Sequence, residues 1–135
     1  MFKAKSQMKY FPLFLGVLVS LNAYGQHWEP IAQTDDGAVY SYDSASVKKD
    51  GDTVTYWELV DYSAPLKSGG LAVVSSKTKV IQDCKNNRFK VADLIDYDGH
   101  KGMGNIVNIE LARQTNWYQS TPESVNEVLK NTVCR

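Results

Sequence analysis

Three Asp-Gly pairs divide much of this chain into segments with the composition of β-strands. The pairs are Asp36-Gly37, Asp50-Gly51 and Asp98-Gly99. An Asp-Gly pair adopts positive φ at little cost, so it is a strong signal for a tight turn between paired strands. The segments around these turns read WEPIA, AVYSYD, TVTYWELVDY, LAVVSSKTKVIQDC, RFKVADLIDYD and NIVNIEL, with a further break expected at SAPLKSGG. The sequence therefore predicts one antiparallel sheet of short strands.

Alternation of apolar and polar residues predicts which face of the sheet is buried. In the run VVSSKTKVIQDC, Val80 and Cys84 oppose Lys77 and Lys79. In RFKVADLIDY, Lys90 and Asp96 are expected on one face, and the other carries Phe89, Val91, Asp93, Ile95 and Tyr97. The run TVTYWELV has apolar residues on both faces, which is typical of a central strand covered on both sides.

The last segment, TPESVNEVLKNTVC, changes to helical spacing. Thr121 is the expected N-cap, with Pro122 at the first helical position. One stripe of the helix is expected to carry Val125, Val128, Leu129 and Val133. The economical architecture is an α+β fold, a single antiparallel β-sheet packed by this C-terminal α-helix. Cys134 would project away from the stripe, so we expect the last helical turn to fray.

The first 25 residues have the pattern of a signal peptide. A lysine-rich start is followed by the apolar stretch YFPLFLGVLVSL, and Ala23 and Gly25 supply small residues before a cut that would leave Gln26 first. The stretch is short of the roughly 20 apolar residues that span a bilayer, although a retained anchor is the alternative. We therefore expect a cleaved signal peptide at residues 1–25 and one domain at 26–135. No stable membrane insertion is expected after cleavage.

The charge balance argues against nucleic acid as a partner. Removing residues 1–25 takes away three lysines and no acidic residue, so 12 basic residues face 15 acidic ones, a net charge near −3. Nucleic acids and anionic membranes both select a basic surface.

Cys84 and Cys134 are the two cysteines of the sequence. An even count in an exported protein favours a structural disulfide, and neither neighbourhood, QDCKNN or NTVCR, offers a Cys-x-x-Cys pattern or a histidine for a metal site. No Gly-x-Ser-x-Gly elbow is present, and His27 and His100 are the only histidines. The sequence therefore predicts a protein that is not an enzyme and holds no metal.

The stretch DYDGHKGMGNIVNIEL carries the densest group of candidate contact residues: His100, Lys101 and Met103. Its glycines follow the spacing Gly-x-x-Gly-x-Gly and a strand-like segment follows them, so it does not fit a dinucleotide-binding loop. His100 and Met103 are plausible haem ligands, whereas an exposed connection rich in glycine is the simpler interpretation. Tyrosine and tryptophan residues elsewhere in the domain favour a protein partner, because both are enriched at interfaces.

The order of these landmarks resembles the surface-adhesin protein E family of exported bacterial proteins. The resemblance begins at Trp28 and runs through VYSYDSASVKKDGDTVTYWELVDY, SSKTKVIQDCKNNRFKV, DYDGHKGMGNIV and NWYQSTPESVNEVLKNTVC, covering residues 27–134. It implies a six-stranded antiparallel sheet joined to the C-terminal helix by a Cys84–Cys134 disulfide.

The resemblance also implies a non-catalytic binding role. Family members engage host extracellular-matrix and plasma proteins such as vitronectin and laminin, and haem binding is attributed to one of them. The chain has no cysteine just after the expected cut, so a lipid anchor is not indicated. We therefore expect an exported protein of the periplasm, the medium or the cell surface. Its expected partner is a protein, reached through an exposed sheet face or the loop of His100, Lys101 and Met103, with periplasmic haem-type binding as the alternative.

Overall fold

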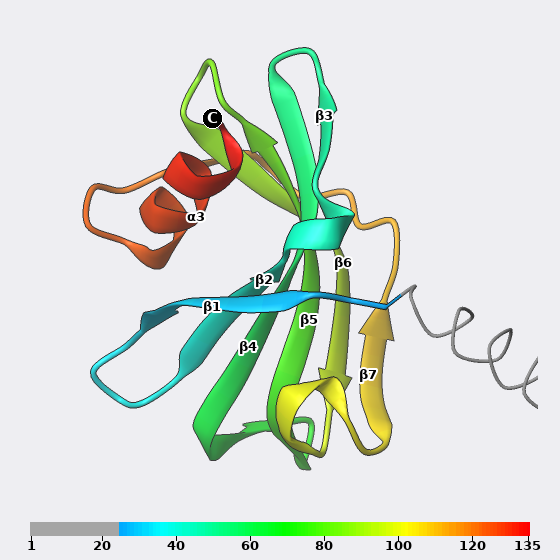
Figure 1. Ribbon diagram of the computed structural model, residues 1–135. Coiled ribbons are helices and arrows are strands. Elements are labelled where there is room, and N and C mark those ends of the chain that lie inside the picture. Colours follow the sequence, from blue (N-terminus) through cyan, green and yellow to red (C-terminus); the bar gives the residue numbers. More distant parts are fainter. Residues whose placement is uncertain (1–24) are drawn as a thin grey trace, which may run out of the picture.

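The computed structural model describes residues 25–135, so the expected signal peptide lies outside the described residues except for Gly25. Within these residues the fold is one antiparallel sheet with a single helix beside it (Figure 1). Six main strands pair in chain order: β1 (Trp28–Gln33), β2 (Val39–Asp43), β4 (Thr53–Ser68), β5 (Leu71–Asp83), β6 (Arg88–Tyr97) and β7 (Ile106–Glu110). The short strands β3 (Lys48–Asp50) and β8 (Tyr118–Gln119) pair with β4 and β6, respectively. The predicted α+β class is confirmed.

In the part of the chain that the structure describes, the remaining elements are two 3-10 turns and the C-terminal helix. The turn η3 (Ser44–Ser46) follows β2, and η4 (His100–Gly102) lies between β6 and β7. The helix α3 (Val125–Val133) ends the chain. Within residues 25–135, no helix is long and apolar enough to cross a membrane.

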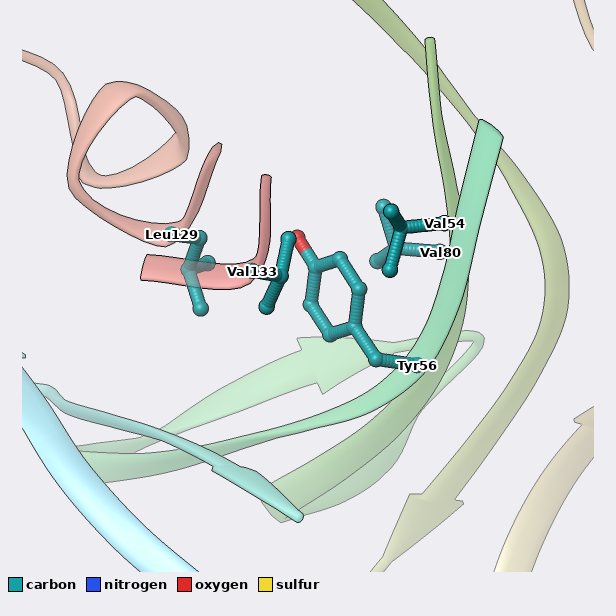
Figure 2. Close-up of a cluster of buried hydrophobic side chains, with 5 residues drawn as sticks. All are labelled: Val54, Tyr56, Val80, Leu129 and Val133. Carbon is teal, nitrogen blue, oxygen red and sulfur yellow. The ribbon is translucent and has the colours of Figure 1, made fainter. Parts of the chain in front are cut away.

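The hydrophobic core lies between α3 and the sheet. Leu129 and Val133 project from the helix onto three strand residues, Val54, Tyr56 and Val80 (Figure 2). All five are buried, and each large apolar side chain that leaves water in this way contributes about 1.5–3 kcal/mol. A disulfide joins Cys84, the residue after β5, to Cys134, the residue after α3. It links the sheet covalently to the helix. The predicted covalent link is confirmed.

The helix begins three residues later than predicted. Ser124 is the N-cap, and its Oγ accepts a hydrogen bond from the Glu127 N–H at 3.2 Å. Ser124 and Glu127 have the spacing of a capping box. The helix cannot begin at Thr121, because Glu123 has a positive φ of 65° that no helix accommodates. The predicted N-cap at Thr121 is therefore wrong.

The buried stripe of α3 is narrower than predicted, and its last turn does not fray. Val128 is 41% exposed and lies outside the buried stripe. The stripe consists of residues spaced four apart, of which Leu129 and Val133 are the last two. Only Cys134 leaves helical geometry, with φ −90° and ψ 26°, and its N–H still donates to the Lys130 carbonyl at 2.9 Å. That single step brings the sulfur to Cys84.

β4 is longer than the sequence predicts. The expected break at SAPLKSGG is wrong over residues 63–68, since Leu66 pairs with Val73 and the strand continues to the turn at Gly69-Gly70. Residues 62–65 leave the ladder, and Pro65 falls among them, where its missing N–H costs no strand hydrogen bond. The predicted central position is confirmed, because β4 lies between β2 and β5 and is buried on both faces.

The two faces of the sheet differ in character. Adjacent side chains of a strand point to opposite faces, and paired residues share a face. We call the side that packs on α3 the helix face; its central residues are Val54, Tyr56, Glu58, Thr78, Val80 and Gln82. We call the opposite side the outer face; its central residues are Trp57, Leu59, Asp61, Ser75, Lys77 and Lys79.

A β-bulge in β6 overturns the predicted alternation of that strand. The register passes from Val80 paired with Val91 to Lys79 paired with Asp93, so Ala92 has no partner. An extra residue reverses the face of every side chain beyond it. Consequently Asp96, expected on a solvated face, is buried and accepts hydrogen bonds from Ser76 Oγ at 2.6 Å and Asn108 Nδ2 at 3.1 Å, and the predicted apolar face of β6 is split between the two sides of the sheet.

The Tyr56 hydroxyl is buried against α3 without a hydrogen-bond partner among the described residues. Burial also raises the pKa of this hydroxyl above its ordinary value. Because an unsatisfied buried hydroxyl costs stability, Tyr56→Phe is expected to leave the free energy of unfolding unchanged or raise it by up to about 1 kcal/mol. Urea denaturation of the two proteins measures the difference.

Tyr62→Phe is the matched control. The Tyr62 hydroxyl lies 3.3 Å from Ser76 Oγ, so its removal is expected to cost about 0.5–1.5 kcal/mol. A loss at Tyr56 as large as that at Tyr62 would show that the Tyr56 hydroxyl has a stabilising partner.

Candidate functional site

The loop at residues 98–105 is folded back onto the outer face of the sheet. Two side chains anchor it. Asp61 Oδ1 accepts the Lys101 N–H at 3.0 Å and lies 2.9 Å from His100 Nδ1. The fully buried Ser75 hydroxyl donates to the Gly99 carbonyl at 2.6 Å and accepts the Gly102 N–H at 2.8 Å. η4 therefore rests on β4 and β5 as a fixed part of this face (Figure 1).

Two glycines of this loop are favoured for different reasons, Gly99 by a close approach of backbone and Gly102 by its backbone conformation. A Cβ added at Gly102, where φ is 69°, would lie 2.5 Å from Lys77 Cε. At Gly99, with an ordinary φ, an added Cβ would lie 2.6 Å from the Met103 carbonyl oxygen. The Gly99 contact is with backbone of the same loop and cannot be relieved by a side-chain movement, whereas the Lys77 side chain can move away from Gly102, where it is the positive φ that favours glycine.

The structure separates the roles of the three predicted contact residues. His100 has 64% of its side chain exposed and uses Nδ1 on Asp61, whereas Met103 is 69% exposed. Lys101 lies at positive φ and extends along a neighbouring hollow. No group of three or more His, Cys, Asp or Glu residues within the described range could hold a metal ion.

An apolar hollow lies beside Lys101. Its volume is about 340 Å³, at the lower end of the range for ligand and side-chain pockets. Four elements meet around it: β1, β2, β4 and η4. We call it the Trp28 hollow, and it is lined by Trp28, Pro30, Val39, Ser41, Leu59, Asp61 and Lys101.

Lys77 fixes the aromatic wall of the Trp28 hollow. Its Nζ lies 5.7 Å from the centre of the Trp28 ring and 5.4 Å from that of Tyr97, so one ammonium group lies within reach of two aromatic rings. The same Nζ is 3.3 Å from Gln26 Oε1. Contacts of this kind contribute about 0.5–1 kcal/mol each and favour the observed position of the Trp28 ring.

Of the residues that line the hollow, the sequence predicted only Lys101 as a contact residue. Leu59 had a usable signal, since it lies on the face of β4 opposite Tyr56 in the alternating pattern. Asp61 had none, because its importance comes from the loop that returns to it from 40 residues further along the chain.

Comparisons with known proteins agree with this fold. A family model described as surface-adhesin protein E matches residues 28–135. Crystal form II of Haemophilus influenzae protein E is similar over 82% of this chain and 89% of that chain, with 17% identity and a TM-score of 0.61. Protein E from non-typeable Haemophilus influenzae matches over 82% of this chain and 85% of that chain, with 18% identity and a TM-score of 0.54. At these identities the likeness shows the fold. A search of curated proteins gave no match.

Proposed function

The chain belongs to the surface-adhesin protein E family, and on this premise we propose that it is a non-catalytic protein-binding domain. The proposed contact site is the Trp28 hollow together with the loop of His100, Lys101 and Met103. The observation that carries the proposal is that a tryptophan-lined recess and an anchored loop lie side by side on the same sheet face. A partner that inserts one apolar side chain into the hollow would also meet the loop.

The chemistry of the site fits a protein interface. Trp28 offers a large rigid contact area, and Leu59 forms a buried apolar floor. Asp61 and Lys101 place opposite charges on the rim, where polar groups select orientation more than they add affinity. Since the loop is held by four hydrogen bonds to Asp61 and Ser75, little conformational entropy is lost when a partner docks.

We propose a host extracellular-matrix or plasma protein as the partner, in keeping with an adhesin family. The proposed route to that partner is export through a signal peptide at residues 1–25, with release to the periplasm or the medium, or display at the cell surface. Binding of the purified protein to immobilised matrix and plasma proteins tests this proposal. If none of a broad panel binds, the host-binding function is excluded.

Trp28→Ala is expected to weaken binding to such a partner about 30-fold or more, since a central tryptophan at an interface typically carries at least 2 kcal/mol. Surface plasmon resonance with the immobilised partner measures the change in Kd. Lys101→Asn, which removes the rim charge while keeping a residue type that tolerates positive φ, is expected to slow association more than it speeds dissociation.

Tyr118→Ala is the control for Trp28→Ala, because Tyr118 is an exposed aromatic residue on β8 that does not line the Trp28 hollow. Thermal unfolding of each variant shows whether the sheet is intact. Equal losses of affinity in the Trp28 and Tyr118 variants would place the contact site elsewhere.

A further inference from the structure

A second and larger hollow lies on the outer face, next to Trp57. Its volume is about 580 Å³. The floor is formed by Thr55 and Trp57 of β4, and the walls come from η3, β3 and Lys79 of β5. The protein-binding site proposed above does not use it, because no residue lines both hollows. We call this space the Trp57 hollow.

The Trp57 hollow is rigidly built. Ser46 ties its η3 wall to its floor, since the Ser46 hydroxyl donates to the Asp43 carbonyl at 2.7 Å and accepts the Trp57 N–H at 2.9 Å. The β3 wall is held by strand pairing of Lys48 with Thr55. A recess fixed by backbone contacts on two sides is already formed before a ligand enters.

Two lysines of this hollow are free to bind an anion. Within residues 25–135, neither Lys48 nor Lys79 has a carboxylate oxygen within 4 Å of Nζ. Asp50 lies on the rim. The carboxylate nearest in register to Lys79 is Asp93, its partner on β6, and that side chain accepts the Ala112 N–H at 2.8 Å.

The acidic residue at the end of β5 is similarly engaged. Asp83 binds Asn86 and pairs with Arg88 at 2.9 Å, and these hydrogen bonds lower the pKa of its carboxyl group to about 2. The Asp83 carboxylate therefore interacts with residues of its own turn. It does not pair with the lysine ammonium groups of the outer face, which can bind an anion.

We propose that the Trp57 hollow binds one sugar unit of an anionic polysaccharide. The C–H groups on one side of a pyranose ring pack on the electron-rich face of an indole, which is the role assigned to Trp57. Lys48 and Lys79 would then reach sulfate or carboxylate groups on that sugar, and the hydroxyl of Thr55 can hydrogen-bond to it.

The outer face extends this site in the way a chain of sugars needs. Lys77 lies two residues from Lys79 on the same face of β5, roughly 7 Å away by strand geometry. On β6, the Lys90 Nζ lies 4.7 Å from the centre of the Trp117 ring, and no salt bridge of the described residues involves it. Cations beside aromatic rings thus recur along the face, as successive acidic sugars require.

Isothermal titration of the protein with a heparin-type hexasaccharide tests the proposal. Binding of the unchanged protein is expected, and Lys48→Gln with Lys79→Gln should weaken it about tenfold or more, because two charged hydrogen bonds are lost. Lys67→Gln with Lys85→Gln alters the net charge equally at exposed positions outside the hollow and should leave Kd within about twofold. Equal losses of affinity in the two double variants would mean that only the net charge matters for binding. That result would overturn the proposed site.

Two further arms identify the ligand and separate this site from the protein-binding one. Hyaluronan-type hexasaccharides, which carry carboxylates and no sulfate, show which anion is preferred, and neutral dextran should not bind. Trp57→Phe should weaken sugar binding, whereas Trp28→Ala should not. Failure of the unchanged protein to bind either acidic hexasaccharide would overturn this proposal and leave the proposed protein-binding function untouched.

Discussion

Removing the Cys84–Cys134 disulfide is expected to lower the free energy of unfolding by about 4 kcal/mol. The two cysteines are 50 residues apart in sequence, and the chain-entropy estimate for a loop of that size gives this figure. The helix gains most from the link. α3 has nine residues, and isolated helices shorter than about 12–15 residues are marginal in water. Its attachment therefore depends on Leu129, Val133 and the disulfide together.

The cleanest form of the experiment replaces both cysteines by alanine and follows urea unfolding by tryptophan fluorescence and circular dichroism. Changing both residues avoids a free thiol that would react with other molecules. A reductant should destabilise the unchanged protein and leave the double variant unaffected, which separates loss of the disulfide from the effect of alanine. A change below about 1 kcal/mol would show that packing alone holds α3 to the sheet.

The parts of the fold that the sequence predicts correctly are those governed by regular local patterns. The alternation along β5 is uninterrupted in its pairing with β4 from Ser75 to Asp83, so Val80 and Cys84 fall on the helix face as expected. The alternation along β6 fails because Ala92 is inserted without a partner. Nothing in the composition of RFKVADLIDY marks that residue, since a bulge is defined by the neighbouring strand.

The start of α3 illustrates a different limit. Thr121-Pro122 and Ser124 with Glu127 are two valid helix-start signals three residues apart. The positive φ of Glu123 belongs to the turn that brings the chain round from β8, and this tertiary requirement selects the second signal. Local sequence alone gives both candidates similar weight.

The candidate site shows why residue identity predicts contacts poorly. The sequence predicts His100, Lys101 and Met103 as one group of contact residues. In the structure, Lys101 lines the Trp28 hollow, whereas His100 contacts Asp61. The hollow itself requires the register of β1, β2 and β4 and the return of a distant loop. The strand register and the position of the loop depend on contacts between distant segments, so no single sequence motif predicts them.

Glu58 is expected to make the protein less stable as the pH rises from 5 to 8. This carboxyl group lies on the helix face, paired in register with Tyr42 and Thr78, and no described residue forms a salt bridge or side-chain hydrogen bond with it. Burial raises the pKa of Glu58 from 4.5 to about 7. The charge of Glu58 in turn contributes to raising the pKa of the neighbouring Tyr40 hydroxyl, after burial itself.

The sign of the effect follows from proton binding. Between pH 4.5 and 7 the folded protein holds a proton on Glu58 that the unfolded chain has released. Raising the pH therefore favours the unfolded state across this interval, and the total loss is on the order of 3 kcal/mol. Below pH 4.5 both states are protonated, and above pH 7 the penalty is complete.

Glu58→Gln removes the titrating group while keeping nearly the same shape. The variant is expected to match the unchanged protein near pH 5 and to exceed its free energy of unfolding at pH 8 by up to about 3 kcal/mol. Urea unfolding at intervals of half a pH unit measures both profiles. Glu123→Gln, at an exposed position in the turn before α3, serves as the control and should reproduce the unchanged profile. Parallel profiles for the Glu58 variant and the unchanged protein would mean that Glu58 is already ionised in the folded state at pH 5, with its charge solvated at the edge of the helix face.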